Sequence, residues 1–403
     1  MKFMPPVLSL RYILSTAIAI LLLAIASFGQ GGENIYEFAG GLDGQQPSGA
    51  VIFDSSGSLY GITSSGGAYS QGTAYKLTAP STPGAPWIKE VLYNFTSGVD
   101  GGHPFTALVF NKNGSLYGLT ASGGNPPQCG GHGCGVIFQL SPPAIPGGPW
   151  TETAIYKFQN EQPRIGLTVD AAGALYTAAS SFTTNYTYIF KLSPPQEKGG
   201  VWTKAILSDV AFNIMPDLVF DNEGALYGAV WSAIFKLSPP ASPRGNWTFR
   251  YIYYLDSTPF PYAGPIFNKG TGHLFGTAPL GGLVGCGESC GVVYELAEVQ
   301  GVWHEEEIYD FEDQSDGFYP KDAVTFDSTG ALYTTSSTSG QGGPGSVIRV
   351  VRGTKGEWKE TTLWTVTGLG ESDPSAVVVY DGSLFGTTKG GGSGYGAVFQ
   401  VKP

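Results

Sequence analysis

One short pattern dominates the sequence: glycine, a variable residue, leucine, and then tyrosine or phenylalanine. It occurs seven times, with its glycines at positions 57, 114, 173, 224, 272, 330 and 382. The interval between glycines is therefore 48 to 59 residues. Repeats of about 50 residues that are built from short strands are typical of a β-propeller, in which each repeat forms one blade and packs against the next.

Each repeat predicts four β-strands. The first ends in an aromatic residue and a turn, as in residues 107–114, and the second carries the Leu-Tyr or Leu-Phe pair. The third is an apolar run such as residues 137–143, which ends in paired prolines that cannot continue a hydrogen-bonded ladder. The fourth begins with tryptophan and often ends in Tyr-x-Phe, as in residues 87–95. Because aromatic residues suit half-buried sheet faces, we interpret them as core.

The two ends of the repeat array complement each other. Residues 397–403 read as a third strand without a fourth, and residues 34–40 read as a fourth strand without a preceding blade. Pairing them would complete the last blade and remove exposed sheet edges, which otherwise invite aggregation. The sequence therefore predicts an all-β fold over residues 34–403, a single seven-bladed β-propeller of four-stranded antiparallel blades that the N-terminal strand closes.

The first 26 residues have the features of a secretory signal peptide. Lys2 and Arg11 precede an uncharged apolar run at residues 12–26, which ends in a small-residue cleavage site, Ala24-Ile25-Ala26. An uncleaved membrane anchor is the alternative, but this run is short for a span, which needs about 20 residues. We expect cleavage after residue 26, a short linker over residues 27–33, and a mature protein that is secreted or periplasmic, soluble, and without a further membrane span.

The composition excludes several classes of function. Only 13% of the residues are charged, about half the roughly 25% of an ordinary globular domain. The net charge of −11 argues against nucleic-acid binding, which requires lysine and arginine to neutralise phosphates. The sequence has no HExxH, nucleophile-elbow, P-loop or dinucleotide-binding signature. We therefore expect no cofactor and no metal, and we expect a monomer.

The repeats resemble a known family. The patterns DG-x-x-P, D-x-x-G-x-L-Y-G, T-x-x-G-G and G-x-V-F-x-L-x-P recur in this order over residues 35–403. They are similar to those of the GloVer tandem-repeat family, bacterial exported proteins also known as choice-of-anchor proteins. The resemblance implies an exported repeat protein and implies no particular activity.

The four cysteines form two close pairs. Cys129 and Cys134 lie between the second and third predicted strands of the second repeat, and Cys286 and Cys290 lie at the same place in the fifth. Blades three apart on a ring of seven do not bring these loops together, so we predict two local disulfides in an oxidising compartment. A zinc site is an alternative for the first loop, where His132 adds a third ligand, but closed zinc sites use four. Redox chemistry is a further alternative.

A candidate ligand site follows from a second repeated feature. In most repeats a proline stands six residues before the hydrophobic residue that ends the first strand, as Pro104 does before Phe110. The residue after each proline is not repeated; in order these residues are Ser48, Phe105, Arg164, Asp217, Tyr262, Lys321 and Ser375. By analogy with other propellers, we expect these positions to surround one mouth of the central channel.

Repeated positions are explained by the blade, whereas a varying ring is free to bind a ligand. We therefore hypothesise that a ligand contacts Phe105, Arg164, Asp217, Tyr262 and Lys321. Their mixture of aromatic, cationic and anionic groups suits a polar ligand with an apolar face, such as a sugar. The alternative is that these residues vary because they face water and nothing constrains them.

Two other groups of residues are weaker candidates. His103 precedes one of the prolines and could act as an acid or base or contact a ligand, but the sequence shows no partner for it, which favours a solvated side chain. Four aspartates lie in glycine- or proline-containing turns, where their carboxylates can accept backbone hydrogen bonds; calcium binding is the alternative. These are Asp43, Asp100, Asp316 and Asp373.

The sequence favours a non-enzymatic exported binding module that holds an extracellular glycan or protein at the channel mouth. A polysaccharide- or lactone-acting enzyme that uses the same face is the first alternative, and a rigid scaffold is the second. Catalysis by paired carboxylates is disfavoured because Asp217 is the one carboxylate among the seven ring positions.

Overall fold

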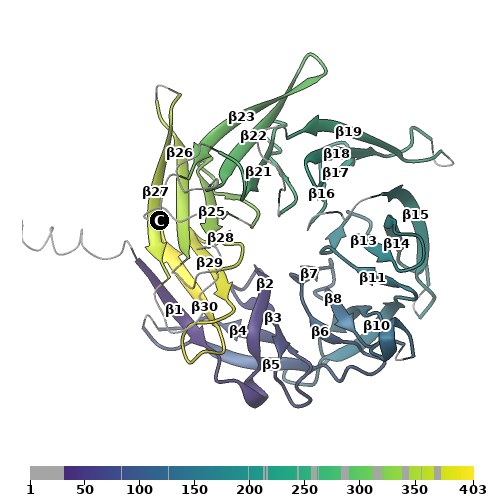
Figure 1. The fold of residues 1–403 in the computed structure, drawn as a ribbon. Helices are drawn as coiled ribbons and strands as arrows, with labels where there is room; N and C mark the ends of the chain where they lie inside the picture. The colour runs from purple at the N-terminus through teal and green to yellow at the C-terminus, as the bar shows by residue number, and fades with distance from the viewer. Residues whose placement is uncertain are drawn as a thin grey trace, which may run out of the picture.

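Seven antiparallel sheets surround a central axis in the described part of the chain (Figure 1). The structure is a computed structural model. It describes residues 31–403 except 83, 126, 198, 212–213, 215–216, 243–244, 256–260, 262, 283–289, 312–318, 321, 338–344, 355 and 367–373. Each sheet is one blade, with its first strand nearest the axis and its fourth at the rim. The predicted seven-bladed β-propeller is therefore confirmed.

The first three blades follow the order of the sequence. Blade 1 consists of β2 (Gln45–Phe53), β3 (Leu59–Ser65), β4 (Thr73–Thr78) and β5 (Ile88–Asn94). Blade 2 consists of β6 (Gly102–Pro104), β7 (Val109–Phe110), β8 (Leu116–Ser122), β9 (Val136–Ser141) and β10 (Thr151–Lys157). Blade 3 consists of β11 (Glu161–Pro163), β12 (Thr168–Val169), β13 (Leu175–Ser181), β14 (Thr187–Ser193) and β15 (Thr203–Val210).

Blades 4 to 7 repeat this arrangement. Blade 4 consists of β16 (Val219–Phe220), β17 (Leu226–Val230), β18 (Ala233–Ser238) and β19 (Thr248–Tyr254). Blade 5 consists of β20 (Ile266–Phe267), β21 (Leu274–Ala278), β22 (Val292–Val299) and β23 (Val302–Asp310). Blade 6 consists of β24 (Thr325–Phe326), β25 (Leu332–Ser336), β26 (Ser346–Arg352) and β27 (Trp358–Thr365). Blade 7 consists of β28 (Val378–Tyr380), β29 (Ser383–Thr388), β30 (Ala397–Lys402) and β1 (Gly31–Glu37).

The core lies between blades, and the Leu-Tyr pair explains how it forms. Successive side chains of a strand point to opposite faces of its sheet. In β8, Leu116 therefore packs in the cluster shared with blade 1, whereas Tyr117 packs in the cluster shared with blade 3. The same alternation holds in the other blades, so each pair fastens one blade to both of its neighbours.

The glycine after the pair allows the strands to approach closely. A Cβ atom on Gly118 would lie 2.3 Å from the ring of Phe138 on the neighbouring strand β9. Polar residues of the repeat fix the turn before the pair. The Asp54 carboxylate accepts hydrogen bonds from the N–H groups of Ser56 and Ser58 and from the Tyr60 hydroxyl, at 2.9 to 3.0 Å. The repeated motif is thus accounted for by blade structure.

The N-terminal strand closes the ring, as predicted. β1 pairs antiparallel with β30, from Gly31 opposite Lys402 to Glu37 opposite Ala397. The N–H group of Phe38 then donates to the carbonyl oxygen of Gly396 at 2.9 Å. The strand begins at Gly31, so the last three residues of the expected linker belong to it. The predicted signal peptide lies outside the described residues.

The first predicted disulfide is present. Cys129 and Cys134 are bonded, with their Cα atoms 5.3 Å apart, and the bond closes the loop between β8 and β9. Cys290 is also disulfide-bonded, whereas Cys286 lies outside the described residues. Disulfides persist in oxidising compartments, so the bond fits an extracellular location. Within the described ranges, no helix is long and apolar enough to cross a membrane.

Removing the first disulfide tests its contribution to stability. We expect that the double substitution Cys129→Ser and Cys134→Ser lowers the free energy of unfolding by about 2 kcal/mol, because closing so short a loop removes little chain entropy from the unfolded state. Denaturant titration measures this difference. Peptide mapping without reduction should also link Cys286 to Cys290; free thiols at these two positions would contradict the predicted pairing.

Candidate functional site: the channel mouth

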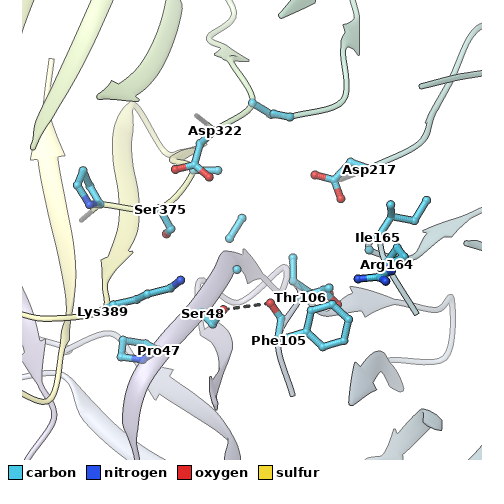
Figure 2. Close-up of a pocket in the computed structure, with 18 residues that line it drawn as sticks. Pro47, Ser48, Phe105, Thr106, Arg164, Ile165, Asp217, Asp322, Ser375 and Lys389 are labelled. Atoms are coloured by element: carbon cyan, nitrogen blue, oxygen red, sulfur yellow. Dashed lines mark hydrogen bonds between the residues drawn. The ribbon is translucent and has the colours of Figure 1, made fainter. Parts of the chain in front are cut away.

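A pocket of about 320 Å³ opens at one end of the central channel (Figure 2). Every blade contributes to its lining. One residue from each blade, in order from blade 1 to blade 7, is Ser48, Phe105, Arg164, Asp217, Ala263, Asp322 and Ser375. The described members of the predicted ring therefore line one pocket; they are Ser48, Phe105, Arg164, Asp217 and Ser375.

The lining segments are interruptions of the first strands. In blade 2, Pro104 ends β6 and the chain rejoins the sheet only at Val109, where β7 begins. The same interruption separates β11 from β12 in blade 3, and the register of β2 shifts between Ser48 and Ile52. Proline has a fixed φ and no N–H group, so it terminates the pairing at the same point. The first strand expected within residues 107–114 ends at its aromatic residue as predicted but is only two residues long, Val109–Phe110, and the segment before it lines the pocket.

Arg164 and Phe105 occupy adjacent blades at this mouth. The Arg164 side chain is exposed, and its Nε donates to the hydroxyl of Ser180 at 3.0 Å. The Phe105 side chain is half-buried, because its ring packs against the core cluster between blades 2 and 3. Its carbonyl oxygen accepts a hydrogen bond from the Ser48 hydroxyl at 3.0 Å. Phe105 therefore offers part of an aromatic surface to the pocket, whereas Arg164 offers a charged group.

Asp217 enters the pocket from a strained backbone position. Its φ of 75° lies in the left-handed region, which a non-glycine residue rarely adopts. Its Oδ1 lies so close to Gly166 that a Cβ there would approach it to 2.6 Å. The residue is exposed to the channel mouth, although all seven blades line the pocket around it. Desolvation by the surrounding protein raises the pKa of Asp217 above its usual value.

The remaining predicted residues have different outcomes. Tyr262 and Lys321 lie outside the described residues, although the residues that follow them, Ala263 and Asp322, line the pocket. His103 is not among the lining residues. Its half-buried ring places Nδ1 at 3.0 Å from the carbonyl oxygen of Ser64 in blade 1. A role for these three residues in ligand binding stays a prediction.

Two charged residues of the pocket were not predicted from the sequence. Asp322 is the second residue after Pro320, whereas the predicted ring consists of the first residue after each proline. Its Oδ2 accepts a hydrogen bond from the Thr335 hydroxyl at 3.2 Å. Lys389 follows strand β29, in a different part of the repeat. Asp217 is still the one carboxylate among the seven positions after the prolines, but Asp322 adds a second carboxylate to the same cavity, so a single carboxylate no longer argues against catalysis there.

The charged groups are arranged for a hydrogen-bonding ligand. Figure 2 shows the carboxylates of Asp217 and Asp322 and the amino group of Lys389 directed toward the cavity. Carboxylates accept hydrogen bonds from hydroxyl groups, and arginine and lysine donate to oxygen atoms. Across the described residues, no group of three or more His, Cys, Asp or Glu side chains is placed to hold a metal ion. The turn aspartates Asp43 and Asp100 instead accept backbone N–H groups, from Ala39 and Thr96.

Comparison with known proteins places the chain in a family. The model of the Gloeobacter/Verrucomicrobia repeat matches residues 25–233, which is just over half of the sequence. The chain belongs to the Gloeobacter/Verrucomicrobia repeat family. The resemblance drawn from the blade motifs is therefore confirmed. No curated protein matches the sequence.

Solved structures of other proteins have a similar fold. The polysaccharide lyase Uly1 has a TM-score of 0.50 at 13% identity, over 91% of this chain and 91% of the lyase. The extracellular domain of a protein assigned as a hybrid two-component system from B. thetaiotaomicron has a TM-score of 0.53 at 10% identity. That match covers 89% of this chain but only 39% of the other protein. At such low identity, both likenesses concern the fold alone.

Proposed function

We propose that this repeat-family protein is a binding module that holds a saccharide at its channel mouth. The observation that carries the proposal is the pocket of about 320 Å³, in which hydrogen-bonding groups of both charges converge beside a partly exposed aromatic ring. Ligand pockets of small molecules are commonly about 300 to 1,000 Å³ and combine apolar lining with a few polar groups that fix orientation.

A saccharide fits this chemistry better than a protein surface does. Its hydroxyl groups both donate and accept hydrogen bonds, so Asp217 and Asp322 can accept from them while Arg164 and Lys389 donate to them. Its ring also has apolar C–H faces, which suit the exposed part of Phe105. A protein partner would normally cover a broader surface with an apolar centre. A concave, charged cavity is poorly suited to that.

Substitutions in the pocket test this proposal. A glycan array that presents neutral, acidic and amino-sugar oligosaccharides would first identify a binding saccharide. We expect Arg164→Ala and Asp217→Asn each to weaken its binding by very roughly 5- to 150-fold, because each change removes a charge-assisted hydrogen bond. Calorimetric titration measures the affinities.

Two matched variants control for charge alone. Lys112→Ala and Glu223→Gln remove a cation and an anion from exposed turns of blades 2 and 4, on the opposite side of the propeller. Exposed substitutions usually change stability by less than about 0.5 kcal/mol, so all four variants should melt like the parent protein. Equal affinity in the pocket variants and the controls would remove this mouth as the binding site.

A saccharide-acting enzyme is the second candidate, and a specific observation favours it. Asp217 and Asp322 supply two carboxyl groups to one cavity, and the raised pKa of Asp217 favours its protonated, proton-donating form more than in an ordinary aspartate. Incubation with polysaccharides and aldonolactones, followed by mass spectrometry, decides between the candidates. Products that disappear with Asp217→Asn and Asp322→Asn would show catalysis. Binding without products would establish a binding module.

A further inference from the structure

Exposed aromatic side chains gather on one side of the propeller. Lys389 follows the second strand of blade 7 and lines the pocket, so the loops between second and third strands lie on the pocket side. Among the described residues, five strongly exposed aromatic side chains occupy these loops, and a sixth ends the fourth strand β19 on the same side. They are Tyr69, Phe182, Tyr186, Trp231, Tyr395 and, in β19, Tyr254.

The opposite side of the propeller has a different character. Its turns, between third and fourth strands, also expose hydrophobic residues, but every one that the structure describes as strongly exposed is aliphatic. They are Ile88, Ile145, Val201, Val299 and Val302. Single exposed hydrophobic residues are ordinary and need no explanation. The restriction of the exposed aromatic residues to the pocket side, by contrast, requires an explanation. The aliphatic residues are not restricted in this way, since Leu42 and Val99 are exposed on the pocket side.

The aromatic loops form an arc around the pocket. They belong to blades 7, 1, 3 and 4, which follow one another around the ring with only blade 2 between them (Figure 1). In blade 2 the corresponding loop is the one closed by the Cys129–Cys134 disulfide. Trp231 lies in a two-residue turn between β17 and β18 and is 52% exposed.

At the other end of the arc, the ring of Tyr395 is held in place. It lies against Gly40, where a Cβ atom would come within 2.8 Å of the ring. Tyr395 is nevertheless 42% exposed, so one part of the ring packs on the backbone and another faces solvent. An aromatic ring that is supported in this way contributes contact area with little loss of conformational entropy on binding.

We propose that these aromatic residues are stacking platforms for an extended neutral polysaccharide, one end or branch of which occupies the channel-mouth pocket. The inference rests on the proposed function and extends it from a small saccharide to a polymer. The rings lie on separate loops, which matches a ligand whose apolar faces recur along a hydroxyl-rich chain. Tyrosine and tryptophan suit such a ligand because each combines an apolar ring with a polar tip.

Charge argues for a neutral polymer. The protein carries a net charge of −11, which repels a polyanionic polysaccharide at long range. In the pocket, the described carboxylates Asp217 and Asp322 are balanced by Arg164 and Lys389. A neutral chain meets no such repulsion and can still use every hydrogen-bonding group of the pocket.

Affinity electrophoresis in gels that contain a polysaccharide tests the proposal. The probes are laminarin, dextran, galactomannan and xylan as neutral polymers, and alginate and polygalacturonate as acidic ones. We expect at least one neutral polymer to retard the protein and the acidic polymers not to. Trp231→Ala and Tyr395→Ala, at the two ends of the arc, should each weaken retardation by roughly three- to ten-fold, and the double variant by more.

Controls separate the arc from the pocket. Ile145→Ala and Val201→Ala remove exposed hydrophobic side chains from the opposite side and should leave retardation unchanged. Mono- and disaccharides from the same polymer should bind the arc variants as they bind the parent, because these ligands reach only the pocket. Arg164→Ala should weaken both kinds of ligand.

The outcomes distinguish the two proposals. If no polysaccharide and no oligosaccharide binds, the proposed function fails and the arc proposal fails with it. If a neutral polymer binds through the pocket but is insensitive to the arc variants, only the arc proposal is wrong. Retardation by the acidic polymers alone overturns the inference of a neutral ligand. Arc variants that lose polymer binding and keep oligosaccharide binding support it.

Discussion

A protein that lacks residues 33–40 should aggregate, or should melt far below the intact propeller. The deletion removes most of β1, the outer strand of blade 7, and leaves β30 as an unpaired edge. Exposed sheet edges template pairing with other chains, so aggregation is the expected consequence. The ring also loses the contact through which its first residues join its last strand.

The deletion is expected to lower stability strongly because it also removes a core residue. Phe38 is fully buried in the cluster between blades 7 and 1, where its ring meets that of Tyr75 edge-on at 5.2 Å. Truncating one buried phenylalanine typically costs about 3 to 5 kcal/mol, and the deletion removes the strand pairing in addition. Because the free energy of unfolding of a domain is only about 5 to 15 kcal/mol, the stability lost by the deletion approaches the total. Differential scanning calorimetry and light scattering measure the two effects.

A circular permutant provides a matched control. Gly31 pairs with Lys402, so residues 31–40 can be joined after Pro403 through a short turn like those between the third and fourth strands of the other blades. The permutant keeps every residue of the strand and changes only the order of the chain. We expect it to fold and melt close to the parent. A deletion variant that melts like the parent would show that ring closure contributes little.

The fold was predictable because its determinants are local and repeated. The Leu-Tyr pair, the turn made by residues such as Asp54, and the paired prolines each act within a few residues of the strand that they define. Their periodicity then fixes the number of blades. Closure was predictable because residues 34–40 and 397–403 are each an incomplete part of a blade and complete one another.

The pocket was only partly predictable because no local pattern creates it. Arg164, Asp217 and Asp322 come from separate blades and meet only after the ring closes. The proline marked the correct segment, but the break in each first strand is longer than one residue, so Asp322 was overlooked. Lys389 belongs to another loop, and nothing in its own repeat indicates that it reaches the channel.

A second large effect concerns a charged contact that recurs between blades. The second residue after the tryptophan of a fourth strand faces an acidic residue that lies at, or just before, the start of the same blade's first strand. In blade 1, Lys89 pairs with Asp43 at 2.7 Å, and in blade 3, Lys204 pairs with Glu161 at 2.5 Å. A tyrosine hydroxyl also donates to each carboxylate, from Tyr36 and Tyr156 respectively.

Blade 2 places a carboxyl group where the other two blades have lysine. Glu152 on β10 takes this position opposite Asp100, which accepts hydrogen bonds from the Tyr93 hydroxyl at 3.1 Å and from the N–H of Thr96 at 2.9 Å. The Oε1 atom of Glu152 is buried without a hydrogen-bond partner among the described residues. Burial, and then repulsion from Asp100, raise the pKa of Glu152 to about 8, while Lys157 on the same strand opposes the shift.

This raised pKa predicts that stability falls as the pH rises. Below the ordinary glutamate pKa of about 4.5, Glu152 is protonated in both the folded and unfolded states. Between that pH and about 8 the folded protein binds the extra proton, so each increase in pH favours unfolding. Above about pH 8, Glu152 is ionised in both states and a further rise in pH costs no more stability. Because Glu152 is partly exposed and solvent screens its charge, we expect the loss to be about 1 to 2 kcal/mol.

Two substitutions at Glu152 isolate this effect. Glu152→Gln removes the ionisable group, and Glu152→Lys recreates the contact that Lys89 and Lys204 make in blades 1 and 3. At pH 8.5 both variants should be more stable than the parent, the lysine variant by about 1 to 2 kcal/mol, whereas near pH 5 the advantage should shrink because the parent is then protonated. Urea titrations at both pH values measure the difference. If either variant were more stable than the parent by the same amount at both pH values, protonation of Glu152 would not be the cause of the pH dependence. The burial of its side chain alone would then explain the lower stability of the parent.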